Sequence, residues 1–145
     1  MDSRLCRLTE WVGLIALDSL HKPYIWGANG PEAFDCSGFL GFILKQVKAL
    51  PDNYDDTAQG YYNRYKCWPL DNGLLGAAAF YGKDEDHITH VMVCINDRVC
   101  IGAVRGNKWV DTPEKAQKRG ARVDVRPIKY RPDLVAILDP FDGHR

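Results

Sequence analysis

The first half of the chain carries apolar residues at the spacing of amphipathic helices. Residues 3–19 and 36–49 repeat apolar side chains three or four positions apart, the period at which a helix buries one face. Ser3 is a suitable cap for the first of these helices, and Asp55 or Asp56 can cap a third, shorter helix over residues 56–65. The apolar face of the second helix consists of Phe39, Leu40, Ile43 and Val47.

The second half changes to short, β-branched apolar runs separated by turn residues. A small helix interrupts them, with Thr112 as its cap, Pro113 in its first turn and Gly120 just past its end. Helices followed by strands predict an α+β fold, in which the N-terminal helices pack on an antiparallel sheet of about five strands. The expected strands cover residues 75–81, 88–95, 99–103, 122–128 and 134–138.

Length, charge and composition narrow the class of protein. A chain of 145 residues suits one domain over residues 1–145, which we expect to act as a monomer without a cofactor or a metal. The 19 Lys and Arg balance the 19 Asp and Glu, so no nucleic-acid or membrane partner is expected. No run approaches the roughly 18 apolar residues of a membrane span, and the N-terminus lacks the pattern of a signal peptide. We therefore expect synthesis in the cytoplasm without membrane insertion.

One of the five cysteines stands where a turn gives way to a helix. The cysteines form no CxxC pair and are odd in number, which favours reduced thiols over a disulfide framework. The free N–H groups at a helix N-terminus favour a thiolate, so we expect a lowered pKa for Cys36 and propose it as a nucleophile. The other four are expected to be structural: Cys6, Cys67, Cys94 and Cys100.

A histidine on a predicted strand offers the base that such a nucleophile needs. In the run 88–95, alternation places His90 and Met92 on one face of the strand and Val91 on the other. If the helix that begins at Cys36 packs on the His90 face, the imidazole meets the thiol at the helix start. That arrangement is the nucleophile and base pair of cysteine catalysis.

These motifs together resemble the NlpC (p-sixty) family of cell-wall cysteine peptidases. The resemblance rests on the segment from Tyr24 to Gly27, Tyr-Ile-Trp-Gly, followed by Asp-Cys-Ser-Gly over residues 35–38 and by His90 opening a Val-rich strand. It implies a papain-like core and cleavage of amide bonds in the stem peptides of bacterial peptidoglycan.

The resemblance also implies roles for single residues. Cys36 corresponds to the nucleophile and His90 to the general base. Tyr24 corresponds to a tyrosine that shapes the oxyanion or substrate site, and Asp35 to a carboxylate that holds a substrate amino group in several members. Ser37 is expected to assist at the same place.

The chain departs from the family pattern at Gly102. Members usually carry His, Asn or Gln about 12 positions after the catalytic His, where it orients the imidazole, and here that position is Gly102. Either a backbone carbonyl, a water or a residue from elsewhere replaces it, or the site is impaired. We favour a main-chain carbonyl or a water, because the nearest polar side chains, Asn96, Asp97 and Asn107, lie in or beyond the turns that bound the strand.

Two other patterns have both a structural and a functional interpretation. His87 and His90 form an HxxH, but a spacing of three on a strand points the two rings to opposite faces, so we expect no metal site. Seven basic residues between Lys115 and Arg131 accompany a single acid, Asp124; they form either a solvated face or a patch for an anionic polymer.

The function expected from the sequence is a peptidoglycan hydrolase, a cysteine endopeptidase or amidase. The alternatives are an acyltransferase or deamidase on the same fold, and a catalytically silent module that binds cell-wall peptides. Without a signal peptide, such an enzyme is expected to reach the wall through a phage holin, a phage tail or a secretion system.

Overall fold

The fold described here comes from a computed structural model and covers residues 3–141. Within that range the chain forms a six-stranded antiparallel sheet with helices packed on one side of it, which confirms the predicted α+β class. None of the described helices is long and apolar enough to cross a membrane. The helices are α1 (Ser3–Asp18), α2 (Cys36–Gln46), α3 (Ala58–Tyr65) and α4 (Pro113–Arg119).

The sheet has the order β1-β6-β2-β3-β4-β5, and every neighbouring pair is antiparallel. Five of its strands match the predicted runs closely, whereas β1, a two-residue strand, was not predicted because it is too short to show a pattern. The strands are β1 (Pro69–Leu70), β2 (Ala78–Gly82), β3 (Ile88–Cys94), β4 (Val99–Val104), β5 (Arg122–Pro127) and β6 (Leu134–Leu138).

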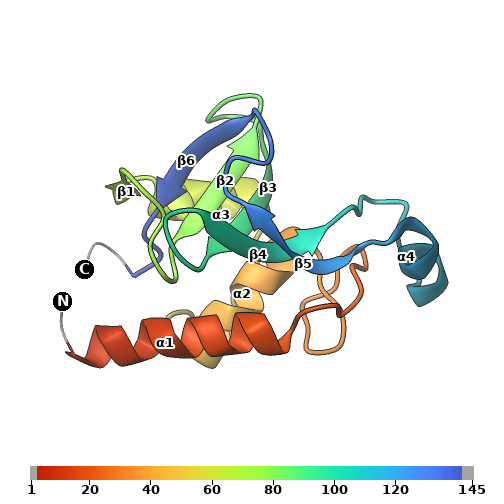
Figure 1. The fold of residues 1–145 in the computed structure, drawn as a ribbon, viewed down its shortest axis with the longest axis horizontal. Helices are drawn as coiled ribbons and strands as arrows, with labels where there is room; N and C mark the ends of the chain where they lie inside the picture. Colours follow the sequence, from red (N-terminus) through yellow and green to blue (C-terminus); the bar gives the residue numbers. More distant parts are fainter. Residues whose placement is uncertain (1–2, 142–145) are drawn as a thin grey trace.

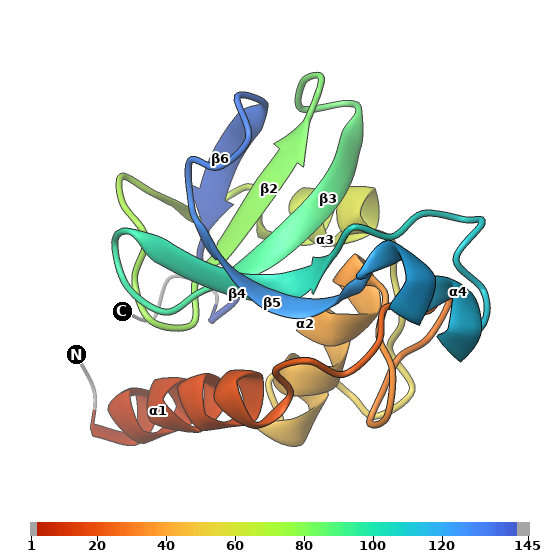
Figure 2. The same ribbon diagram turned by 45° about the vertical axis from the view of Figure 1, so that its right-hand side comes forward.

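The main hydrophobic core lies between α2 and the sheet. In Figures 1 and 2, α2 lies between α1 and the strands, so this short helix is covered on two sides. Its apolar residues pack with the strand side chains that face the helices, including Phe80, Val91, Val93 and Ile101. A smaller cluster on the opposite face of the sheet contains Ala79, Tyr81, Met92, Cys94 and Cys100.

The ends of α4 follow the predicted signals, whereas Ser3, predicted as the cap of the first helix, is the first residue of α1, and α2 ends at Gln46, before the predicted end near Ala49. Thr112 caps α4, and Gly120 closes it in the left-handed conformation at φ 70°, where a residue without a Cβ is favoured. The cap of α3 is Thr57, whose side chain accepts a hydrogen bond from the Gly60 amide, rather than Asp55 or Asp56. Asp56 instead accepts hydrogen bonds from the Thr57 amide and the Tyr54 hydroxyl.

Candidate active site

Cys36 is the first residue of α2, and Asp35 fixes this helix start. Asp35 Oδ1 accepts hydrogen bonds from the Gly38 amide at 2.7 Å and from the Ser37 hydroxyl at 3.3 Å. Its Oδ2 accepts one from the amide of Gly27 at 3.0 Å, so the carboxylate ties the preceding loop to the helix. The predicted position of Cys36 at a helix N-terminus is therefore confirmed.

Asp35→Ala is expected to lower the free energy of unfolding by about 1–2 kcal/mol, because it removes the cap of α2 together with the loop contact. Thermal unfolding measures this change as a fall in Tm of several degrees. Asp35→Asn keeps a capping oxygen and is expected to lose less than half as much. An unchanged Tm for the alanine variant would contradict the capping role.

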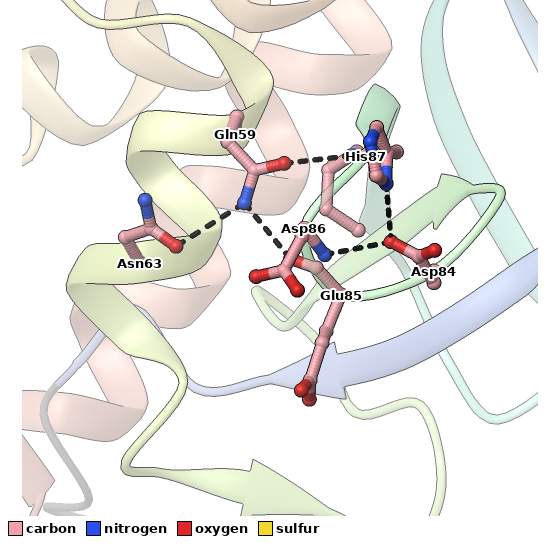
Figure 3. Close-up of polar contacts among 7 residues, drawn as sticks. Gln59, Asn63, Asp84, Glu85, Asp86 and His87 are labelled. Carbon is pink, nitrogen blue, oxygen red and sulfur yellow. Dashed lines mark hydrogen bonds and ion pairs between the residues drawn. The ribbon is translucent and has the colours of Figure 1, made fainter.

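His90 lies on β3, and a side chain of α3 holds the start of that strand. Gln59 accepts a hydrogen bond from the Ile88 amide at 2.7 Å and donates one to the carbonyl of Glu85 at 2.9 Å (Figure 3). His87, which lies just before β3, pairs with Asp84 at 2.6 Å in the same exposed turn. These contacts fix the start of β3, the strand that carries His90.

Helix α2 packs on one face of β3, and His90 lies on the opposite face. The apolar residues of α2 contact Val91 and Val93, whereas His90 lies on the face of Met92 and Cys94, so the expected packing of this helix on the His90 face is wrong. The physical reason is that α2 buries more apolar surface against the face of the sheet that carries the larger set of aromatic and β-branched side chains.

Cys36 and His90 nevertheless reach a common cavity at one end of the sheet. Strands β3 and β4 pair only at Val93 with Ile101 and at Cys94 with Cys100. Beyond these pairs β4 turns away from β3, and Figure 2 shows β4 and β5 running across the direction of β2 and β3. The divergence opens a cavity of about 390 Å³ that both Cys36 and His90 line. Within residues 3–141 no hydrogen bond joins the thiol to the ring.

A second cavity of about 650 Å³ lies on the other side of Cys36 and is lined by Asp35, Ser37 and Asp56. Cys36 and Tyr24 border both cavities. Cys36 thus lies where two cavities with different lining residues meet.

Tyr24 is held against this junction by the backbone and by a glycine. Its amide donates a hydrogen bond to the carbonyl of Ala121, and its ring packs so closely on Gly106 that a Cβ there would lie 2.0 Å from the ring. Burial, followed by the charges of Cys36 and Asp35, raises the pKa of Tyr24 above its ordinary value. The hydroxyl therefore stays protonated and can donate a hydrogen bond to an oxyanion.

The surroundings of Cys36 raise the pKa of its thiol, whereas the helix start alone led us to expect a lowered pKa. Burial, and then the charge of Asp35, raises the pKa of Cys36 to about 11, although the amides of Val91, Ser37 and Cys36 itself favour the thiolate. Burial and the Arg131 charge lower the pKa of His90 to about 3. Desolvation therefore outweighs the helix N-terminus at the thiol, and it also favours the neutral form of the imidazole.

The rate of Cys36 alkylation by iodoacetamide is expected to rise with pH throughout the neutral range, because a thiol with a raised pKa gains thiolate only as pH approaches about 11. Peptide mass mapping at a series of pH values measures this rate. A preformed thiolate and imidazolium pair would instead give a rate that stays constant from mildly acidic to neutral pH, and that result would contradict the neutral site.

The His90 ring has a partner that the sequence did not reveal. The hydroxyl of Tyr130 lies 3.0 Å from His90 Nε2. Tyr130 follows His90 by 40 positions, in the turn between β5 and β6, and its surroundings in sequence resemble an ordinary turn. The turn residues around it gave no signal of a site, because the contact depends on how this turn folds back over the face of β3.

The basic run contributes directly to the smaller cavity. Three of its arginines line this cavity together with Arg105, and the residues that line it include no carboxylate. Arg126 pairs with Asp124 and Arg131 with Asp133, both outside the cavity lining. The third arginine of the run is Arg119, whose Nε donates a hydrogen bond to the Arg105 carbonyl.

Comparison with known proteins places the chain in a family. The sequence model of the NlpC/P60 family matches residues 21–123, well over half of the chain, and this range includes Tyr24, Asp35, Cys36, Ser37 and His90. The chain belongs to the NlpC/P60 family. The matched range ends before Tyr130.

The relatives of this NlpC/P60 chain are longer proteins. A probable endopeptidase p60 of Listeria grayi is 61% identical over 100 residues, which is 62% of this chain and 19% of that protein. A probable endopeptidase of Corynebacterium glutamicum is 49% identical over 37 residues, 25% of this chain and 18% of that protein. The chain thus spans about a fifth of the length of these relatives.

Solved structures confirm the NlpC/P60 fold. An NlpC/P60 family protein of Bacillus cereus superposes with a TM-score of 0.73 at 18% identity, covering 92% of this chain and 40% of that one. The peptidoglycan hydrolase RipB of Mycobacterium tuberculosis superposes with a TM-score of 0.66 at 17% identity, covering 97% and 68%. At these identities the likeness concerns the fold alone.

Proposed function

We propose that this NlpC/P60 chain hydrolyses an amide bond in the stem peptides of bacterial peptidoglycan, with Cys36 as the nucleophile and His90 as the base. The observation that carries the proposal is that a cysteine at a helix start and a histidine from the sheet line one open cavity. The name of the Listeria grayi relative, a probable endopeptidase, and that of RipB, a peptidoglycan hydrolase, support the reaction and the substrate.

The reaction follows from the positions of these groups. The Cys36 sulfur attacks the carbonyl carbon while its proton moves to the free ring nitrogen of His90. The negative charge that develops on the carbonyl oxygen is stabilised by N–H donors at the start of α2 and by the Tyr24 hydroxyl. His90 returns the proton to the leaving nitrogen, and the C–N bond breaks. Water then loses a proton to His90, attacks the thioester and releases a carboxylic acid and the free thiol.

The two cavities suggest how a stem peptide is oriented. Because His90 protonates the leaving amine, the cavity that His90 lines holds the leaving-group half, and the cavity with Asp35 holds the acyl half. A substrate amino group suits the side of Asp35 and Asp56, and a carboxylate suits the arginine side. Stem peptides carry both kinds of group.

Mass spectrometry of purified peptidoglycan before and after incubation tests the proposed function. We expect new fragments whose masses correspond to one amide bond broken and one water added. A product that joins two stems would indicate an acyltransferase, and loss of ammonia alone would indicate a deamidase. Binding of the wall without any mass change would favour the silent module and contradict the proposed hydrolysis.

Replacing Arg105 and Arg119 together by alanine is expected to lower kcat/KM several-fold for a stem peptide with a free carboxylate on the leaving side. Neither guanidinium has an ion-pair partner among the described salt bridges, so both are available to pair with that carboxylate. Steady-state kinetics on that peptide and on its amidated form measure the effect, which should nearly vanish for the amide. Lys118→Ala, on the same helix as Arg119 but outside the cavity lining, is the matched control. Equal losses on both peptides would contradict a carboxylate contact.

A further inference from the structure

We infer that Tyr130 is the positioning residue for the His90 imidazole and takes the place of the side chain that Gly102 lacks. The inference rests on the proposed function, since it assigns His90 the role of base. It gives a site in the turn between β5 and β6 a part in the reaction, outside the residues that the family match covers.

The hydrogen bond determines which ring nitrogen is left for the thiol. Tyr130 Oη lies 3.0 Å from Nε2 of His90, so Nδ1 is the nitrogen that remains available. A base needs a free lone pair at Nδ1, and a neutral ring with that lone pair carries its proton on Nε2. The Nε2–H group then donates to the Tyr130 oxygen. A tyrosine hydroxyl can donate or accept, so the direction of this bond is part of the inference: with Tyr130 as the acceptor, the contact holds the tautomer that can take the Cys36 proton, as the orienting group of a catalytic triad does.

The position of Gly102 shows why the usual arrangement is absent. Gly102 lies close to Met92, whose side chain belongs to the apolar cluster on the face of the sheet that also carries His90. A Cβ at residue 102 would lie 2.5 Å from the Met92 sulfur. Met92 therefore occupies the space that a larger side chain at 102 would need, and the partner of His90 comes from a different part of the chain.

Tyr130 is held firmly enough to orient a ring. Its amide donates a hydrogen bond to the carbonyl of Pro127 at 3.1 Å, and its ring packs edge-on against Tyr81 with centroids 5.6 Å apart. The next residue, Arg131, makes two hydrogen bonds to Asp133, at 2.9 and 2.6 Å, and its guanidinium lies over the Tyr81 ring. A turn fixed in this way can hold a hydroxyl at a defined position.

The polar residues that are nearer in sequence are engaged elsewhere. Asn96 accepts hydrogen bonds from the amides of Arg98 and Val99, and Asn107 accepts one from the amide of Trp109. The sequence left a main-chain carbonyl, a water or a residue from elsewhere as the orienting group, and Tyr130 is the third of these alternatives. These partners agree with the prediction that Asn96 and Asn107 do not orient the imidazole.

Tyr130→Phe tests the inference, because it removes the hydroxyl and keeps the ring against Tyr81. We expect kcat for stem-peptide cleavage to fall about 10- to 100-fold with KM nearly unchanged, since a hydrogen bond to the charged ring is lost in the transition state but no substrate contact is lost. Tyr62→Phe removes a hydroxyl from a tyrosine that lines neither cavity and is the matched control, with kcat expected within twofold of wild type.

The ring tautomer is measured without any substrate, which separates this inference from the proposed function. In ¹⁵N–¹H correlation spectra of the histidine rings, with the His90 signals assigned from His90→Asn, we expect the Nε2-protonated form in the wild type. In Tyr130→Phe we expect a mixture of the two neutral forms. These spectra remain informative even if the natural substrate is not the proposed one.

Two results would overturn the inference. The first is an unchanged tautomer in Tyr130→Phe, because the hydroxyl would then have no influence on the ring. The second is a loss of activity that appears in KM alone or that accompanies a large fall in Tm, because a contact to substrate or a purely structural role would explain it. A fall in kcat with an altered tautomer and an unchanged Tm supports the positioning role.

Discussion

Replacing Cys36 by alanine is expected to lower kcat/KM for stem-peptide cleavage by more than about ten-thousandfold. In the proposed reaction the thioester intermediate forms on this sulfur, and without it only the N–H donors and substrate binding remain to accelerate the reaction. Cys36 is only partly buried and stands in the first turn of α2, so the Tm is expected to stay close to that of wild type. Chromatographic detection of the cleaved peptide measures the loss.

Cys67→Ser is the matched control, because Cys67 is an exposed thiol away from both cavities. Its kcat/KM is expected to equal that of the wild type. Retention of most activity in Cys36→Ala, with the fold intact, would show that the nucleophile is another group.

Replacing His90 by alanine is expected to lower kcat by more than about a thousandfold. The thiol has a raised pKa, about 11, so at neutral pH it depends on the neighbouring base to lose its proton. The same ring returns that proton to the leaving nitrogen, and alanine at 90 removes both transfers. Single-turnover kinetics at a saturating enzyme concentration measure the chemical step directly.

His87→Ala is the control for His90, since His87 is an exposed ring paired with Asp84 three residues earlier. We expect its kcat to stay within about threefold of wild type. A comparable loss in both variants would indicate that the turn before β3 supports the site as a whole and would contradict a specific role for the His90 imidazole.

The elements of the fold could be predicted well because their signals are local. The helix that begins at Cys36 follows from its apolar period, and the small helix from Thr112 to Gly120 follows from its cap, its proline and its closing glycine. The five longer strands are short apolar runs between turn residues, and four of them are rich in β-branched residues. The strand Pro69–Leu70 was missed, since two residues cannot show an alternation.

The arrangement of the site could be predicted only in part. The residue types at Cys36 and His90 follow from their motifs, but the face on which the helix packs depends on the competition between two apolar faces of β3. The pKa of the thiol depends on burial, which a sequence pattern does not give. Tyr130 depends on a contact across 40 residues between a turn and a strand, and neither the strand period nor the family spacing indicates it.

The role of Cys36 as the nucleophile is tested most directly by comparing the alkylation of its thiol with the loss of turnover. In a Cys6→Ser, Cys67→Ser background, iodoacetamide at mildly alkaline pH has Cys36 as its accessible target, because Cys94 and Cys100 are buried. Peptide mass mapping gives the fraction of Cys36 alkylated at each time, and stem-peptide cleavage gives the remaining activity. If Cys36 is the nucleophile, activity falls in direct proportion to alkylation of Cys36. Cleavage that survives complete alkylation of Cys36 would contradict this role.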